Sequence, residues 1–196
     1  MDYNILVDEL PVSYRGFRIR TSYKVGILLS QVMSDTTVED DIKIYTAMNL
    51  LYIDKPEDTL IALKGIQWFL SCGKSEIHEI DKPTEHTNDI IIDYDVDQLD
   101  ILAAFRVYKI ELTDKMHYWE FTSILPNLKD TTLAQKMQYR SVDLKDLKGE
   151  SKKFYAEMKN KYKVRPLMSE EEWQEYQNKL REIHGDYYMR MLQLNS

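Results

Sequence analysis

Apolar side chains recur three or four residues apart along most of this chain, and this spacing places them on one face of an α-helix. Val25, Leu28, Leu29 and Val32 follow it between residues 23 and 33. The same pattern predicts further helices over residues 36–52, 54–73, 95–108, 113–125 and 131–140. The sequence therefore predicts a mainly α-helical fold.

The segment over residues 54–73 carries the strongest signals for its two ends. Asp54, Pro56 and Glu57 combine an N-cap residue, an early proline and a first-turn carboxylate, and Gly73 is typical of the residue that follows a helix. Because the stretch between them is apolar on nearly all sides, we expect it to be the central and most buried helix.

Other helix starts match the capping box, in which the N-cap side chain and a side chain three residues later satisfy free backbone N–H groups. The matches are Thr36 with Glu39, Asp95 with Gln98, and Ser169 with Glu172.

The first twenty residues have a strand-like pattern instead. Residues 3–7 and 17–20 flank a stretch rich in turn residues at 11–16, which predicts a small N-terminal β-hairpin. In the second strand apolar and basic residues alternate, so one face is expected to lie on the helices. Residues 74–88 are polar and lack a period, which indicates a surface loop, and 90–92 form either a short strand or an extended lead-in.

The composition changes after Val142. Residues 144–165 are rich in lysine, and Phe154, Met158 and Tyr162 lie four residues apart, which favours an amphipathic helix. We therefore expect a compact helical core domain with the N-terminal hairpin at residues 1–147. A C-terminal helical extension, made of a lysine-rich connector and an amphipathic helix, is expected at residues 148–196.

The final helix carries a stripe close to a heptad repeat, to which we assign the protein-binding role. This C-terminal seam consists of Trp173, Tyr176, Leu180, Ile183, Tyr187 and Met191. The seam either packs back on its own domain or presents aromatic anchors to another subunit or a partner. The connector that precedes it favours the second alternative, because it could let the helix stand away from the domain.

Composition narrows the class of protein. The chain is 43% hydrophobic and 30% charged, which is typical of a soluble globular protein. No apolar run reaches the roughly 20 residues of a membrane helix, no signal segment is expected, and the single Cys72 fits a reducing cytoplasm. The formal net charge is −7, divided as −10 in residues 1–100 and +3 in residues 101–196. The acidic half argues against nucleic-acid binding. It is either a solvated surface or a face for a basic partner.

Motifs for catalysis, metals or cofactors are missing. His78 and His86 lie among acidic residues, but their spacing matches no metal-ligand pattern. Four aspartates between residues 93 and 100 resemble the start of a calcium loop, yet Gln98 and Ala104 stand where glycine and glutamate are needed. We attribute these carboxylates to the favourable field at a helix N-terminus. His117 is expected at the core or its boundary. Neither an enzyme nor a cofactor is predicted.

A series of short segments resembles a family of tail-region proteins from phages and prophages of Gram-positive bacteria, encoded just ahead of the tape-measure gene. The likeness covers about residues 15–147 and rests on residues 65–74, 93–94, 100–105, 108–112, 117–121, 125–128 and 137–140. It implies a tail assembly chaperone in the host cytoplasm that binds the tape-measure protein, possible contacts with the tail tube protein, self-association, and absence from the mature virion. The alternatives are a minor structural component of the tail and an acidic regulatory protein that binds a basic host protein.

Overall fold

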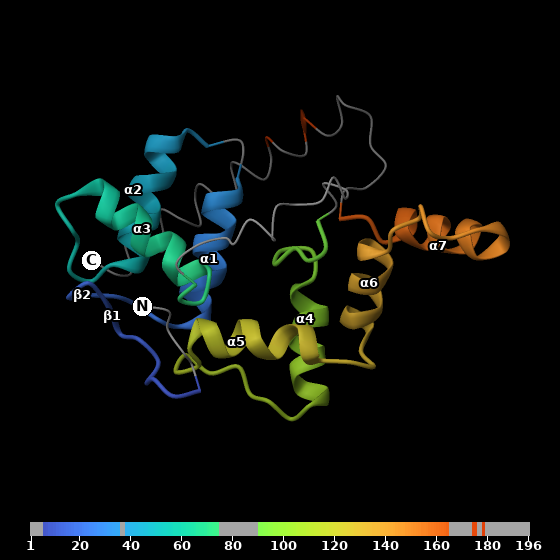
Figure 1. Cartoon of the computed structure of the whole chain (residues 1–196), viewed down its shortest axis with the longest axis horizontal. Helices are drawn as coiled ribbons and strands as arrows, with labels where there is room; N and C mark the ends of the chain where they lie inside the picture. Colours follow the sequence, from blue (N-terminus) through green and yellow to red (C-terminus); the bar gives the residue numbers. More distant parts are fainter. Residues whose placement is uncertain (1–5, 36–37, 75–89, 165–173, 176–177, 179–196) are drawn as a thin grey trace. The chain divides into compact units, whose positions relative to one another are not determined.

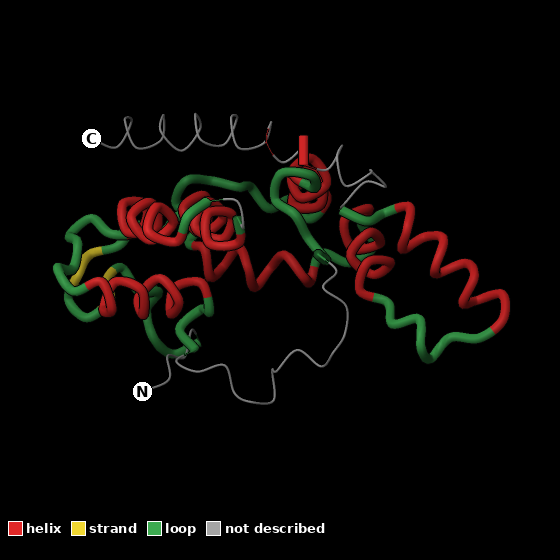
Figure 2. Tube along the Cα trace, turned by 90° about the horizontal axis from the view of Figure 1, so that it is seen from above, coloured by secondary structure: helices red, strands yellow, loops and turns green. Residues whose placement is uncertain are grey.

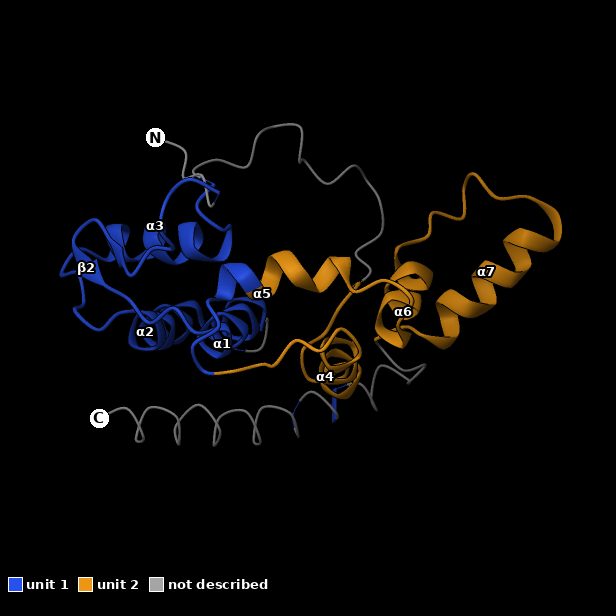
Figure 3. Cartoon of the chain, turned by 90° about the horizontal axis from the view of Figure 1, so that it is seen from below, with its two compact units in different colours: residues 1–76, 114–120, 168–196 blue, residues 77–113, 121–167 orange. Residues whose placement is uncertain are grey.

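The computed structural model describes residues 6–35, 38–74, 90–164, 174–175 and 178 (Figure 1). Its helices and one two-stranded antiparallel hairpin confirm the predicted mainly α-helical class (Figure 2). The chain divides into two compact units (Figure 3). Unit 1 comprises Met1–Glu76, Asp114–Glu120 and Met168–Ser196, and unit 2 comprises Ile77–Thr113 and Phe121–Leu167.

Unit 1 is built on three helices that pack against one another: α1 (Tyr23–Ser34), α2 (Asp40–Leu51) and α3 (Thr59–Leu70). Each presents apolar side chains at helical spacing to the common core, where Leu29, Leu51 and Phe69 have no exposed surface. These helices confirm the segments predicted at 23–33 and 36–52. The capping box predicted at Thr36 and Glu39 is wrong, because Glu39 is itself the N-cap residue of α2 and its side chain makes no capping hydrogen bond.

The N-terminal hairpin consists of β1 (Ser13–Tyr14) and β2 (Phe17–Arg18). Arg15 and Gly16 connect the strands with φ angles of 49° and 88°, as a tight two-residue turn requires. The predicted hairpin is confirmed, but its first strand lies inside the stretch expected to be the turn, and residues 6–7 form a turn. Ile19, just after β2, is 4% exposed, so the alternating pattern does place one face on the helices.

The two ends of α3 differ in how well the sequence predicted them. The predicted start is wrong, because Asp58 is the N-cap and accepts from the N–H groups of Leu60 and Ile61 at 2.8 and 3.4 Å. At the other end Cys72 and Gly73 have φ angles of 54° and 82° and close a Schellman motif, which confirms the predicted stop. The helix is not enclosed on all sides, since Leu60 is 58% exposed.

Helix α5 (Tyr118–Ile124) begins in unit 1 and is shorter than the helix predicted over 113–125. The indole N–H of Trp119 donates to the Phe69 carbonyl at 2.8 Å, and Phe69 stacks on Tyr118 with ring centroids 5.4 Å apart. Gly26 of α1 permits this packing, because a Cβ at that position would overlap the Tyr118 ring. The aromatic side chains at the start of α5 therefore complete the core of unit 1.

Unit 2 contains α4 (Gln98–Val107), the 3₁₀ turn η2 (Leu125–Asn127), α6 (Thr132–Ser141) and α7 (Gly149–Lys161). Helix α6 packs on both α4 and α7. Phe105 of α4 stacks on Phe121 with ring centroids 5.3 Å apart and an interplanar angle of 5°. Thr131 caps α6 by accepting from the Ala134 N–H at 3.1 Å, which confirms the start predicted for this helix.

Helix α7 confirms that the lysine-rich stretch is helical, although Phe154 of the expected apolar stripe is 48% exposed. Its Lys159 is 7% exposed and donates to the Val142 carbonyl at 2.9 Å, and Tyr162 stacks on Tyr139 of α6. This packing crosses residue 147, the expected end of the core domain. The division into a core domain and a C-terminal extension stays a prediction.

Candidate functional site

The six residues of the predicted C-terminal seam lie outside the described residues: Trp173, Tyr176, Leu180, Ile183, Tyr187 and Met191. His78 and His86 also lie outside them. Within the described ranges, no three His, Cys, Asp or Glu side chains are grouped to hold a metal ion. None of the described helices has both the length and the hydropathy of a membrane-spanning segment.

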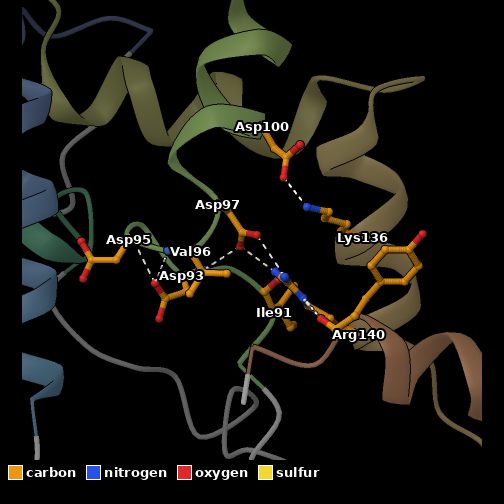
Figure 4. Close-up of polar contacts among 9 residues, drawn as sticks. Ile91, Asp93, Asp95, Val96, Asp97, Asp100, Lys136 and Arg140 are labelled. Atoms are coloured by element: carbon orange, nitrogen blue, oxygen red, sulfur yellow. Dashed lines mark hydrogen bonds and ion pairs between the residues drawn. The ribbon is translucent and has the colours of Figure 1, made fainter. Parts of the chain in front are cut away.

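A buried ion pair joins two helices of unit 2 (Figure 4). Asp97 is the N-cap residue of α4 and its side chain is 0% exposed, while Arg140 in the last turn of α6 is 4% exposed. The guanidinium binds both carboxylate oxygens, with Nη1–Oδ2 at 2.6 Å and Nη2–Oδ1 at 3.0 Å. Such bidentate geometry offsets part of the large cost of removing two charges from water.

Arg140 also binds backbone oxygens from two further segments. Its Nη1 donates to the Ile91 carbonyl at 3.0 Å and its Nε donates to the Tyr162 carbonyl at 2.5 Å. Asp97 Oδ2 in turn accepts from the Asp93 N–H at 3.0 Å. One side chain thus connects the lead-in to α4, α4 itself, α6 and the residue that follows α7. The role of these groups is to organise unit 2.

The predicted capping box at Asp95 and Gln98 is wrong. The Asp93 carboxylate accepts from the N–H groups of Asp95 and Val96 at 2.8 and 2.9 Å, and Gln98 Nε2 donates to the Asp95 carbonyl. Asp97 does not use its side chain to cap the helix.

The sequence contained one signal for the ion pair. Leu133, Met137 and Arg140 follow helical spacing, so Arg140 stands at a core position of α6. An arginine at such a position needs a buried carboxylate.

The side of α4 that faces away from the core of unit 2 is apolar. Leu99 is 76% exposed, Val107 is 67% exposed, and Ala103 lies exposed between them. These three residues, four positions apart, are named the α4 face. A soluble helix usually carries polar residues on its exposed side, so an apolar stripe there is typical of a surface that contacts another polypeptide.

His117 in unit 1 is 5% exposed, as expected for a core or boundary residue. The Nδ1 atom of its ring accepts from the backbone N–H of Trp119 at 3.0 Å. The backbone N–H of His117 donates to the Glu120 carboxylate at 2.9 Å, so the His117 and Glu120 side chains together cap α5. Because Nδ1 is an acceptor, the proton lies on Nε2, which donates to the Pro11 carbonyl at 3.2 Å. Burial lowers the pKa of the His117 imidazole, against smaller opposing effects of Pro11 and Glu120. Both ring nitrogens are used for structure.

The fold and these sites define a helical protein whose described polar groups organise its own core and whose exposed apolar positions suit contacts with other polypeptides. A family model described as "Bacteriophage Gp15 protein" matches residues 6–164, and the chain therefore belongs to the bacteriophage Gp15 protein family. This match confirms the predicted resemblance and makes the chain a tail-related phage protein. It extends beyond the predicted residues 15–147 and includes α7. No curated protein and no solved structure matches the chain.

Proposed function

We propose that this chain is a non-enzymatic tail assembly chaperone that binds the tape-measure protein and itself while the tail is built. The observation that carries the proposal is the family match over residues 6–164, which makes the chain a tail-related phage protein. A chaperone for a long helical protein needs apolar surface for binding and a stable body that presents it. It needs no reaction centre.

The described residues form a stable body, and one of their helices exposes an apolar surface. The α4 face exposes apolar side chains on a helix whose other side is held by Phe105 and by the buried Asp97–Arg140 pair. A few residues near the centre of an interface, most often tryptophan, tyrosine and arginine, contribute most of the binding free energy in protein complexes. We therefore expect affinity to come from apolar contacts, and charged groups to set the choice and orientation of partners.

The C-terminal seam is the binding element that we propose. Its tryptophan and tyrosines combine a large contact area with few rotatable bonds, so little conformational entropy is lost on binding. The acidic first half and the slightly basic second half of the chain also favour head-to-tail self-association, which would weaken as salt screens exposed charges.

Co-expression with the tape-measure protein from the same phage tests the function. An affinity tag on this chain should recover the tape-measure protein, and the double variant Trp173→Ala/Tyr176→Ala should reduce the recovery at least tenfold. Gln177→Ala is the matched control, because it lies beside the seam in the sequence and is not one of its six members. A truncation should end after Val164, because Arg140 binds the carbonyl of Tyr162. If neither the variant nor the truncation lowers recovery, the seam is not the binding element.

Mass spectrometry of purified virions separates a chaperone from a structural protein. A chaperone acts in the cytoplasm of the bacterial host and should be missing from finished particles. Detection at a fixed copy number per tail would instead support a minor structural component. If tagged protein recovers neither the tape-measure protein nor the tail tube protein, the chaperone function is refuted.

A further inference from the structure

Helix α4 is apolar on two opposite sides, although one side is sufficient to hold a helix in a core. Ile101, Ala104 and Phe105 are buried in unit 2. Leu99 and Val107 on the α4 face are 76% and 67% exposed. The described residues therefore leave the face uncovered, and its four-residue spacing is one that accepts an amphipathic helix.

Basic residues occur near the C-terminal end of α4. Arg106 lies between the apolar residues on the exposed side of α4, and Lys109 follows the helix. The Tyr108 hydroxyl donates to the Lys129 carbonyl at 2.9 Å, which brings the backbone of Lys129 near the same end of the helix. Among the described residues, none of the three cations forms an ion pair. A partner with carboxylates at one end of an apolar stripe would complement this surface.

The final segment of this chain has that composition. Between residues 169 and 176 its only charged side chains are acidic: Glu170, Glu171, Glu172 and Glu175. The C-terminal seam begins among them at Trp173 and continues to Met191. As a helix with a rise of about 1.5 Å per residue, the seam would extend for roughly 27 Å, which exceeds the roughly 12 Å between Leu99 and Val107 on α4.

We propose that the α4 face binds residues 169–191 of a second copy of this chain, with the acidic start of the segment beside Arg106. This inference rests on the self-association in the proposed function and assigns its two surfaces. A second copy is the occupant because the acidic start of this segment complements Arg106 on the face, and the proposed self-association supplies that segment from another chain. Because the two surfaces differ, each copy can bind one neighbour through its α4 face and another through its final segment. Such a head-to-tail contact extends into an open array when the rotation does not close.

Photo-cross-linking of the full chain tests the contact directly. Benzoylphenylalanine replaces Ala103 in an equal mixture of ¹⁴N-labelled and ¹⁵N-labelled protein, and the cross-linked peptides are identified by mass spectrometry. We expect cross-links to residues 169–191, with about half of them joining peptides of different isotopes. The same photoreactive residue in place of Leu60, which is 58% exposed on α3, is the matched control and should not reach this segment.

Sedimentation velocity measures the energetic contribution of the face. Leu99→Ser/Val107→Ser should weaken self-association at least tenfold, whereas Leu60→Ser should leave it within twofold. Arg106→Glu should also weaken it, more at low salt than at high salt, because exposed charges are screened. All of these side chains are exposed, so the variants should keep the circular dichroism spectrum of the parent chain.

Several results would overturn the proposal. They are cross-links confined to peptides of one isotope, reaction at Ala103 with the tape-measure protein in place of residues 169–191, and self-association that is unchanged by Leu99→Ser/Val107→Ser. Failure of this contact can be distinguished from failure of the proposed chaperone function. If the intermolecular cross-link forms but no tape-measure protein is recovered, the chaperone function fails and this contact stands. Recovery of the tape-measure protein without the cross-link removes this contact alone.

Discussion

Replacing Arg140 by methionine removes one partner of the buried ion pair while it keeps a side chain of similar length. The Asp97 carboxylate, which is 0% exposed, would lose two charged hydrogen bonds at 2.6 and 3.0 Å. The carbonyl oxygens of Ile91 and Tyr162 would lose their guanidinium donors in the same step. The substitution therefore leaves a buried charge and two backbone acceptors without the groups that bind them.

The expected cost is large compared with the stability of a domain. Removing one member of a buried ion pair destabilises a protein by about 3–5 kcal/mol. A typical net stability is about 5–15 kcal/mol, so Arg140→Met should bring unit 2 close to unfolding. The double variant Asp97→Asn/Arg140→Met should cost less than the sum of the two single changes, because it leaves no unpaired charge. The amide oxygen that this variant places at position 97 could still accept from the Asp93 N–H, as the Asp97 carboxylate does at 3.0 Å.

The assay must report on unit 2. Trp68 and Trp119 belong to unit 1 and Trp173 lies outside the described residues, so tryptophan emission is not a direct reporter of unit 2. Hydrogen exchange of the α4 and α6 amides under increasing urea, followed by mass spectrometry, measures its opening free energy. Lys136→Met is the matched control on α6, because the ion pair of Lys136 with Asp100 is partly exposed, at 24% for each side chain. Its loss should cost about 1 kcal/mol or less.

Two outcomes would refute the reasoning. Arg140→Met could cost no more than Lys136→Met, which would mean that burial of the Asp97–Arg140 pair has no energetic consequence. Alternatively, the single changes at Asp97 and Arg140 could be additive in the double variant, which would mean that the two side chains do not interact in solution.

Three further changes test unit 1, and each can be followed by unfolding monitored through tryptophan emission. Neutral His117 caps α5 and its pKa is lowered by burial, so its contribution to stability is present above the unfolded pKa near 6.5 and is lost as the pH falls below it. In His117→Asn the melting temperature should fall less between pH 7.5 and 5.5, and an unchanged slope would contradict this. Asp58→Ala removes the α3 cap and should cost about 1 kcal/mol, whereas Asp54→Ala, which removes only an exposed ion pair, should cost less. Equal effects of the two would argue against the Asp58 cap. Gly26→Ala should cost about 1–3 kcal/mol, because the new methyl group would overlap Tyr118. A wild-type urea midpoint would show that this approach is not tight.

The hydrophobic pattern predicted the helices because it records which positions must leave water, and that requirement is local to each segment. It located α1, α2, α4 and α6 to within a few residues. Short polar signals were less reliable. Asp54 and Asp58 both suit an N-cap, and in the structure Asp58 caps α3 whereas Asp54 forms an exposed ion pair with Arg18 at 2.6 Å. The first strand was misplaced for a similar reason, because two adjacent residues with positive φ made the turn tighter than its composition suggested.

Of the two proposed binding surfaces, one was found from the sequence and the other from the structure. The C-terminal seam was found from its period alone, and its residues lie outside those described. The α4 face required the structure. Residues 95–108 are apolar at more positions than one helix face needs, and the sequence did not show which of them would remain exposed. Packing of Phe105 on Phe121 decided which side of α4 enters the core and left Leu99 and Val107 in water.

The sequence by itself determined the helical class, most helix positions and the resemblance to a phage tail family, because periodicity and short motifs belong to the local chain. The tertiary structure alone paired Asp97 with Arg140, which are 43 residues apart, and showed that His117 caps α5 while it binds the Pro11 carbonyl. These partners come from distant segments, and each is specified by the free-energy cost of leaving a buried polar group without a hydrogen bond. That cost arises only after the helices have packed, so a local pattern can mark Arg140 as a core position but cannot identify its partner.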